Sequence, residues 1–455
     1  MKLITLILAT MILVSGCENQ TGAPEKKEAI AEPKQTVQNQ QKAVEVKEPS
    51  ETQTVDKQQD SPSTITLLEQ SLQPNLVELA TGALPTWRKF RKEKPALVLF
   101  SQDPLLAPIP DELRAEVVEL LLHGPSEQLK TRLDTTGPNP LLLPSMAVDA
   151  ALEAGLFSRV VWVLPSKSGA DQLDLSVFQS QLLDLGAVDQ AEATSFTTTA
   201  PGVFSGMVRN IPFQAVHIDA LPPLSSPIIL HFDMTFVAPL YKGEIKTPLY
   251  TLLGQLHNTL RAQQWQALAV TVSAANLNGA IPLTSRFVAS DISRFYQQPE
   301  LLDAPLPSQW DKHGRALYLE NFFKKEEVRK LYEEMETDNP EDPAVKYALY
   351  QVLRQFKEGD HALAKLNQAV ALDPVYALEF LELANVAKEQ NLTEQVQRML
   401  MLAIAAQPEN VWLQLQLVGQ LKATGQEEEA EKLLQALREK PWSPVYYPEM
   451  VKQLE

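Results

Sequence analysis

The sequence predicts an α/β domain followed by an all-α domain of helical repeats. Between residues 65 and 303, short apolar runs such as Ala96–Phe100 alternate with amphipathic segments of helical length. From residue 304 to 455, amphipathic segments follow one another and are separated by prolines at a nearly constant spacing. Continuous apolar strands that alternate with helices are typical of a mostly parallel sheet with helices on both faces.

Each predicted strand of the α/β domain is a short apolar run bounded by turn residues. The strands are expected at residues 96–100, 159–165, 213–218, 228–233 and 267–272. Amphipathic segments at 111–122, 145–155, 175–185 and 248–263 are expected to form helices. Asp111 is the expected N-cap of the first of these helices, and Gly155 is the expected C-terminal glycine of the second.

Residues 1–16 have the features of a signal peptide. Lys2 precedes an apolar run over residues 3–14, which is shorter than the roughly 20 apolar residues that span a bilayer as a helix. Residues 13–17 read Leu-Val-Ser-Gly-Cys and resemble the lipobox of bacterial lipoproteins. The resemblance implies that the Cys17 thiol carries fatty acyl chains such as palmitate, so that the chain is anchored to a membrane and faces the periplasm. Glu18 follows the cysteine where inner-membrane retention typically has Asp, which favours the outer membrane.

Residues 17–64 connect this anchor to the folded part. They are rich in Glu, Lys, Gln, Thr and Pro and contain no aromatic residue, so we expect a disordered tether. Cys17 is the only cysteine, which excludes an intramolecular disulfide. The formal net charge of −17 disfavours nucleic acid and anionic membrane surfaces as partners.

Prolines give residues 304–455 their period. They stand at positions 343, 374, 408 and 441, at intervals of 31, 34 and 33 residues by subtraction, and turn signals lie between them at Gly359, Asn391 and Gly425. The order of helix, turn, helix and proline, with small residues such as Ala362 and Ala369 in the second helix, resembles the tetratricopeptide repeat (TPR). We expect three well-formed repeats and one degenerate leading repeat before residue 340.

The TPR resemblance implies a curved stack that binds a protein or peptide on its concave face. Tyr347, Tyr350, Phe380 and Trp412 fall on first helices of the repeats, which line that face in the family, and are the candidate partner-binding residues. The alternative is that these aromatics form a core and that the stack packs on the preceding domain. Residues 442–447 are expected to cap the stack.

Two His-x-Asp pairs are the candidate metal ligands of the α/β domain. They are His217 with Asp219 and His231 with Asp233, and residues two apart in a strand point to the same face. An imidazole beside a carboxylate suits a divalent metal. The second pair lies at the end of a predicted parallel strand, where α/β sheets bind ligands. The alternative is that the histidines satisfy hydrogen bonds and the aspartates cap turns.

This layout resembles the arginase and deacetylase type of α/β domain, whose strand ends carry Asp-x-His and His-x-Asp ligands. The chain lacks the Asp-Ala-His-x-Asp, Ser-x-Asp-x-Asp and Gly-Gly-x-His motifs of that family, so its two-metal site does not carry over. We therefore expect an adaptor with no catalytic residue and no cofactor, which binds a protein through its repeats. The alternative is a metal-dependent hydrolase that acts on an amide or related small substrate.

Overall fold

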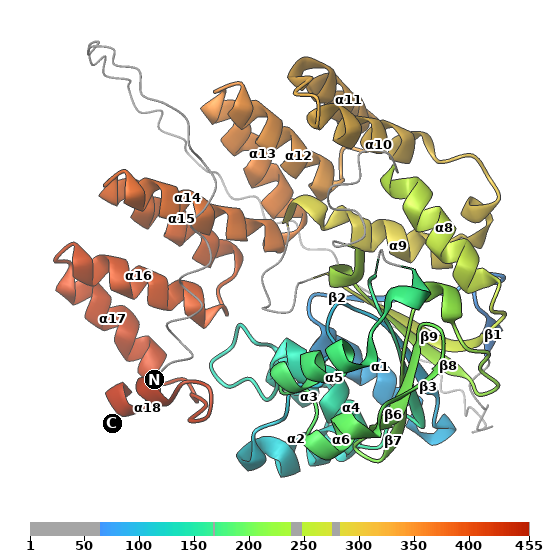
Figure 1. The fold of residues 1–455 in the computed structure, drawn as a ribbon. Helices are drawn as coiled ribbons and strands as arrows, with labels where there is room; N and C mark the ends of the chain where they lie inside the picture. The colour runs from blue at the N-terminus through green and yellow to red at the C-terminus, as the bar shows by residue number, and fades with distance from the viewer. Residues whose placement is uncertain (1–63, 167–168, 238–247, 275–282, 455) are drawn as a thin grey trace, which may run out of the picture. The chain divides into compact units, whose positions relative to one another are not determined.

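One sheet forms the centre of the α/β domain. The computed structural model describes residues 64–166, 169–237, 248–274 and 283–454 (Figure 1). Among these residues nine strands pair in the order β1-β9-β8-β3-β4-β7-β6-β5, and β2 also pairs with β9. The strands are β1 Ile65–Thr66, β2 Asn75–Val77, β3 Ala96–Phe100, β4 Arg159–Val163, β5 Thr197–Ala200, β6 Val203–Val208, β7 Ile211–Val216, β8 Ile228–Asp233 and β9 Gln266–Ser273.

The sheet is mixed, which corrects the expectation of a mostly parallel sheet. The central strands β9, β8, β3, β4 and β7 pair in parallel, whereas β1 on one side and β6 and β5 on the other pair antiparallel. Antiparallel neighbours need only a two-residue connection. Arg209 and Asn210, with φ of 49° and 60°, make such a hairpin turn between β6 and β7.

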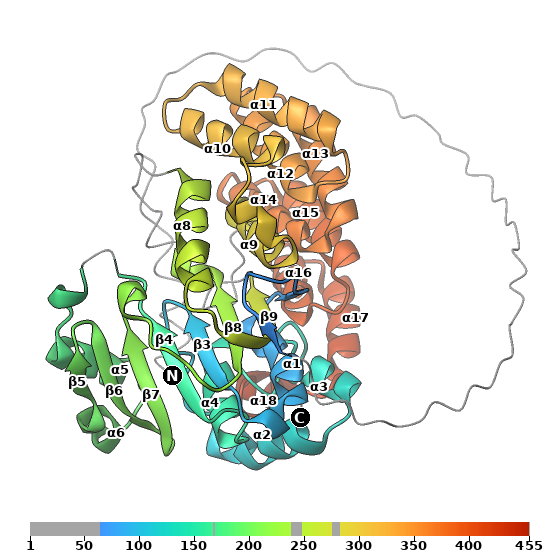
Figure 2. The same ribbon diagram turned by 90° about the vertical axis from the view of Figure 1, so that its right-hand side faces the viewer.

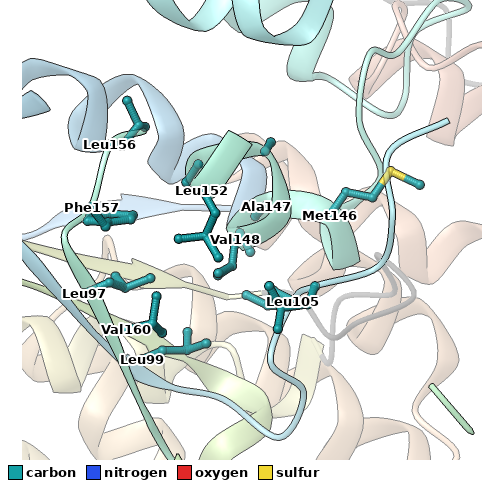
Figure 3. Packing of buried hydrophobic residues seen from close by; sticks show 14 of the residues in the cluster. Leu97, Leu99, Leu105, Met146, Ala147, Val148, Leu152, Leu156, Phe157 and Val160 are labelled. Carbon is teal, nitrogen blue, oxygen red and sulfur yellow. The ribbon is translucent and has the colours of Figure 1, made fainter. Parts of the chain in front are cut away.

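Helices cover both faces of the sheet, as expected. Alternate residues of β3 point to opposite faces, so Leu97 and Leu99 belong to one apolar cluster and Val98 to another. Figure 3 shows the first cluster, where Leu97 and Leu99 lie with residues of α4. This face carries α1 Leu84–Lys89, α2 Asp111–His123, α3 Ser126–Leu133, α4 Ala147–Glu153 and α5 Leu175–Asp184, and the other carries α8 Leu249–Arg261 and α9 Phe287–Gln297.

Two local expectations at helix ends have different outcomes. Asp111 is the first residue of α2 and Pro110 takes the N-cap position, so Asp111 as cap was wrong by one residue. Gly155 lies after α4 with φ of 62°, as expected for a C-terminal glycine.

The order of the parallel strands reverses between β3 and β8. From β3 the chain proceeds to β4 and then β7 on one side, and it later returns to β8 and β9 on the other side. The connection from β3 to β4 carries α2, α3 and α4 on one face, whereas α8 connects β8 to β9 on the opposite face. In open α/β sheets, ligands bind outside the carboxyl ends of the strands at such a reversal.

Antiparallel helix pairs form the C-terminal domain (Figures 1 and 2). The pairs are α10 Ser308–Glu320 with α11 Lys325–Asp338, α12 Pro343–Gln355 with α13 Gly359–Leu372, α14 Leu378–Glu389 with α15 Thr393–Ala406, and α16 Val411–Ala423 with α17 Glu427–Arg438, followed by α18 Pro448–Leu454. The segment expected to be a degenerate repeat is thus a complete helix pair, α10 and α11.

The turns inside the four pairs share one backbone geometry. Phe323, Lys357, Asn391 and Gly425 all have positive φ, between 57° and 74°, and they recur every 34 residues by their numbers. In each turn, the next residue donates its N–H to a carbonyl five residues earlier, as Lys324 does to Leu319 at 3.2 Å. This is the Schellman arrangement, in which the left-handed residue ends the helix. The repeats are therefore equivalent in structure.

The helical stack contacts the α/β domain at its start, middle and end. At the start, Trp310 of α10 stacks on Tyr250 of α8 with ring centroids 5.0 Å apart. At the end, Val411 N–H donates to the Thr136 carbonyl at 3.0 Å and Ser443 N–H to the Pro138 carbonyl at 3.1 Å. In the described part of the chain, no helix is long and apolar enough to span a membrane.

Candidate functional site

Polar side chains replace apolar ones where β8 and β9 end. Register pairs His231 with Thr271 and Asp233 with Ser273 across the two strands. All four side chains point to the sheet face that α1 covers, since Trp87 of α1 packs edge-on against His231 at 5.3 Å. Each of the four residues is at most 2% exposed. These four residues lie beside the point between β3 and β8 where the strand order reverses.

A continuous chain of hydrogen bonds links these groups. Trp87 Nε1–H donates to Thr271 Oγ1 at 3.2 Å, and Thr271 Oγ1 lies 2.8 Å from His231 Nδ1. On the other side of the ring, His231 Nε2 lies 3.3 Å from Ser273 Oγ, which donates to Asp233 Oδ2 at 2.6 Å. An indole can only donate and an ionised carboxylate can only accept. When Asp233 is ionised, each group in this chain therefore donates to the next group in the direction of Asp233. In this arrangement the His231 ring carries its hydrogen on Nε2.

Burial keeps His231 neutral and makes Asp233 hard to ionise. Burial lowers the pKa of His231 to about 3. It raises the pKa of Asp233, and the charge of Asp103 raises it further. When Asp233 takes up a proton, the chain can reverse, because Thr271 Oγ1 can then donate to the Leu230 carbonyl at 3.4 Å. Thr271, His231, Ser273 and Asp233 can thus reverse the direction of their hydrogen bonds, while Trp87 donates to Thr271 in both arrangements.

The end of β3 supplies the second carboxyl group. Ser101 Oγ lies 3.3 Å from Thr235 Oγ1, and Asp103 Oδ1 accepts the Leu105 N–H at 2.6 Å. Burial raises the pKa of Asp103. Leu105 has φ of 57°, which costs an L-residue free energy. The edge between β3 and β8 therefore holds two carboxyl groups among hydroxyls, a set suited to acid–base chemistry or to an oxygen-liganded cation.

The structure does not bring the two His-x-Asp pairs together. His217 follows β7, and its Nδ1 lies 3.3 Å from Asp219 Oδ2. Strands β3 and β4 separate β7 from β8, so the pairs lie on the order of 14 Å apart at the usual strand spacing. Across the described ranges, no group of three or more His, Cys, Asp or Glu side chains could hold a metal ion. His231 and Asp233 bond to the neighbouring hydroxyls of Thr271 and Ser273.

The aromatic candidates of the stack divide into a buried set and one exposed residue. Tyr347 and Tyr350 donate their hydroxyls to the two oxygens of Glu379, at 2.6 and 2.7 Å. Burial raises the pKa of both tyrosines, so they stay protonated as donors. Phe380 is 1% exposed, whereas Trp412 is 47% exposed. Only Trp412 therefore offers a free ring, while the other three stabilise contacts between repeats.

Sequence reasoning missed the partners that fix these candidates. Thr271 and Ser273 are ordinary strand residues, and only their register with β8 places them beside His231 and Asp233. Glu379 gave no signal except that it follows the two tyrosines by about one repeat. Cys17 lies outside the described residues.

No protein-family model matches this chain, and no curated protein is similar to it in sequence. Its function must therefore be inferred from the placement and chemistry of its own residues.

Proposed function

We propose that this protein is a lipid-anchored periplasmic adaptor that binds a protein partner through its TPR-like helical stack. The resemblance of residues 13–17 to a lipobox supports the anchor, and the polar, aromatic-free composition of residues 18–64 supports a tether that would let the folded part meet a partner. Four equivalent helix pairs support a stack of the kind that presents an extended surface.

The observation that carries the proposal is the exposure of Trp412. The Trp412 side chain is 47% exposed, so the fold gains only part of the free energy that full burial of this large aromatic ring would supply. Trp412 is the second residue of α16, and the N–H of Val411, the first residue, donates to the Thr136 carbonyl of the α/β domain. The residue next to Trp412 therefore contacts the α/β domain. Tryptophan is the residue type that most often anchors protein interfaces.

The Glu379 cluster argues for the same location. Glu379 accepts hydrogen bonds from Tyr347 and Tyr350, and from Arg354 Nη1 at 3.0 Å. These bonds satisfy the hydroxyls of Tyr347 and Tyr350 within the stack. We therefore assign the partner surface to the last helix pair, where Trp412 is exposed, rather than to these buried side chains.

Site-specific photocrosslinking tests this proposal. A photoreactive phenylalanine analogue replaces Trp412 in the full chain, and the matched control carries it at Leu185, which is 52% exposed at the end of α5. We expect one discrete crosslinked product in the native envelope from position 412 and none from position 185. No product at 412, or the same product at both positions, would contradict a partner site on the last helix pair.

A second candidate function is the hydrolase, which the two carboxyl groups at the reversal favour. Asp103 and Asp233 occupy the edge where α/β sheets bind ligands. Metal analysis of the purified full chain separates the candidates. One divalent ion per chain, lost on Asp103→Asn, would support the hydrolase, whereas a folded chain without bound metal would support the adaptor.

A further inference from the structure

Three exposed aromatic side chains lie in the last turn of α10 and in the turn that follows it. Tyr318, Phe322 and Phe323 are 49%, 48% and 83% exposed. The rings of Tyr318 and Phe322 contact each other with centroids 4.9 Å apart. We call these three residues the aromatic tip. Two adjacent phenylalanines exposed to this degree lose much of the free energy that burial would supply.

The backbone gives no reason for an aromatic residue at position 323. Phe323 has φ of 57°, a left-handed conformation that costs an L-residue about 1–2 kcal/mol. The equivalent positions of the other turns hold Lys357, Asn391 and Gly425, and the last two are types that tolerate this conformation. The fold thus accepts a smaller residue here. Phe323 therefore combines a strained backbone with an exposed apolar side chain, and neither feature stabilises the fold.

The turn holds the aromatic tip in a fixed position. Phe323 N–H donates to the Glu320 carbonyl at 3.1 Å, and Lys324 N–H donates to the Leu319 carbonyl at 3.2 Å. These bonds tie the turn to the end of α10. The rings are therefore presented outward by a rigid support, so little ordering entropy is lost when they are buried elsewhere.

Charges around the tip balance one another. Lys324 and Lys325 follow Phe323 and are exposed, and they are followed by Glu326 and Glu327. Lys324 Nζ lies 3.8 Å from Glu327 Oε1. Aromatic rings beside long amphipathic lysines are typical of segments that enter the headgroup region of a bilayer. The balanced local charge and the net charge of −17 favour a zwitterionic surface over an anionic one.

We propose that the aromatic tip inserts into the headgroup region of the membrane that holds the lipid anchor. This inference rests on the anchor of the proposed function. The tether expected from the composition of residues 18–64 would have a typical reach of roughly 40 Å, which would keep the tip at a high effective concentration near the bilayer. Weak insertion is then enough to orient the folded part on the membrane.

Vesicle sedimentation tests the proposal without the anchor. The chain from Glu18 to Glu455, which lacks the leader and Cys17, is mixed with phosphatidylcholine vesicles and with vesicles that also contain phosphatidylglycerol. The test variant F322Q/F323N installs the Gln390-Asn391 pair of the third turn. The matched control, V177Q/L185Q, removes two apolar side chains of α5 that are 54% and 52% exposed.

We expect the unaltered chain and the control to partition equally into phosphatidylcholine vesicles, and F322Q/F323N to partition at least tenfold less. F322Q/F323N should melt at the same or a higher temperature, which excludes loss of folding. Equal partition of all three chains, binding only to phosphatidylglycerol vesicles, or a dimer that F322Q/F323N dissociates would overturn the proposal. The mass of the native N-terminus tests the anchor separately, so the two failures are distinguishable.

Discussion

Arg286 donates from Nε to Asp373 Oδ2 at 3.0 Å, and so joins the start of α9 to the end of α13. The same guanidinium makes two hydrogen bonds to the carboxylate of Glu78, which follows β2. Arg286 is 12% exposed in its side chain. One cation therefore links the sheet edge, α9 and the middle of the helical stack.

Replacing Arg286 by Met should lower the free energy of unfolding by about 1–3 kcal/mol, because two carboxylates lose their partner at a partly buried site. Urea denaturation measures the change. Arg261→Met is the matched control, since Arg261 also makes two hydrogen bonds to one carboxylate, that of Asp303, but Asp303 is 68% exposed. The control should cost less than about 1 kcal/mol. Equal losses would show that the interdomain position of Arg286 is irrelevant.

Ser273→Ala should destabilise the fold by about 1–3 kcal/mol, because it leaves Asp233 Oδ2 and His231 Nε2 buried without this partner. Thermal and urea unfolding measure the effect. Ser205→Ala on β6 is the control, since Ser205 bonds to Thr199 at an exposed site and to Gln214 at a partly buried one, both uncharged, and should change stability by no more than about 1 kcal/mol. An effect of Ser273→Ala as small as the control's would contradict the buried relay.

Asp291 makes the junction of α8, α9 and α10 sensitive to pH. Its carboxylate accepts from Tyr250 Oη at 2.8 Å and from Trp310 Nε1 at 2.7 Å. Burial raises its pKa to about 7, above its unfolded value of 3.8. Between these values the folded chain holds a proton that the unfolded chain releases. The contribution of Asp291 to stability is therefore greatest below pH 4 and falls as pH rises to about 7, by about 1.4 kcal/mol per pH unit.

Asp291→Asn mimics the protonated carboxyl group, since its amide can accept from Trp310 and donate to Tyr250. The free energy of unfolding of the unaltered chain minus that of the variant should fall from pH 4 to pH 7 and then level off. Urea denaturation across this range measures the difference. A difference that does not vary with pH would mean that Asp291 ionises at an ordinary pKa.

The ionisation of His257 should change stability with pH in the opposite direction to that of Asp291. Burial lowers its pKa to about 4, from 6.5, and its ring stacks on Phe295 at 4.5 Å. The folded chain therefore loses stability as pH falls from 6.5 to about 4, because the unfolded chain takes up the proton first. His257→Phe should remove this acid-sensitive part. As pH falls from 6.5 to about 4, the free energy of unfolding of the unaltered chain should decrease relative to that of the variant. A difference between the two chains that stays constant with pH would contradict a neutral buried imidazole.

Gly425→Ala should cost about 1 kcal/mol, because Gly425 has φ of 74° and no atom would contact an added methyl group. Lys357→Gly, at the equivalent turn with φ of 62°, should stabilise the chain by a similar or smaller amount. Differential scanning calorimetry of both variants measures the pair of effects. Changes of the same sign would contradict the structural equivalence of these turns.

Short sequence patterns predicted the strands and helices whose formation depends mainly on residues that are close together in the chain. Residues 228–233 were expected as a strand and form β8 with the same bounds, because a continuous apolar run at the centre of a sheet needs no other signal. The proline period correctly predicted paired helices. The two-stranded addition β5 and β6 was not predicted, since Thr197–Ala200 is exposed along its length and has no apolar alternation.

The candidate site was harder to predict because its contacts are distant in sequence. His231 and Asp233 were recognised, but their bonding to Thr271 and Ser273 depends on a register that spans about 40 residues. Likewise, Tyr347 was identified as an aromatic of a first helix, and only Glu379, one repeat later, explains why it is buried. Sequence spacing therefore selected candidate residues, whereas pairing between distant segments determined which side chains they contact.

Mass spectrometry of the mature N-terminus from native membranes tests the central claim most directly. The adaptor and the membrane-inserted aromatic tip both require that the chain begins at Cys17 with fatty acyl chains on that residue. We expect a first peptide whose Cys17 carries a diacylglyceryl group on sulfur and an acyl chain on its amino group. A Cys17 with a free thiol, or a chain that retains residues 1–16, would contradict the account.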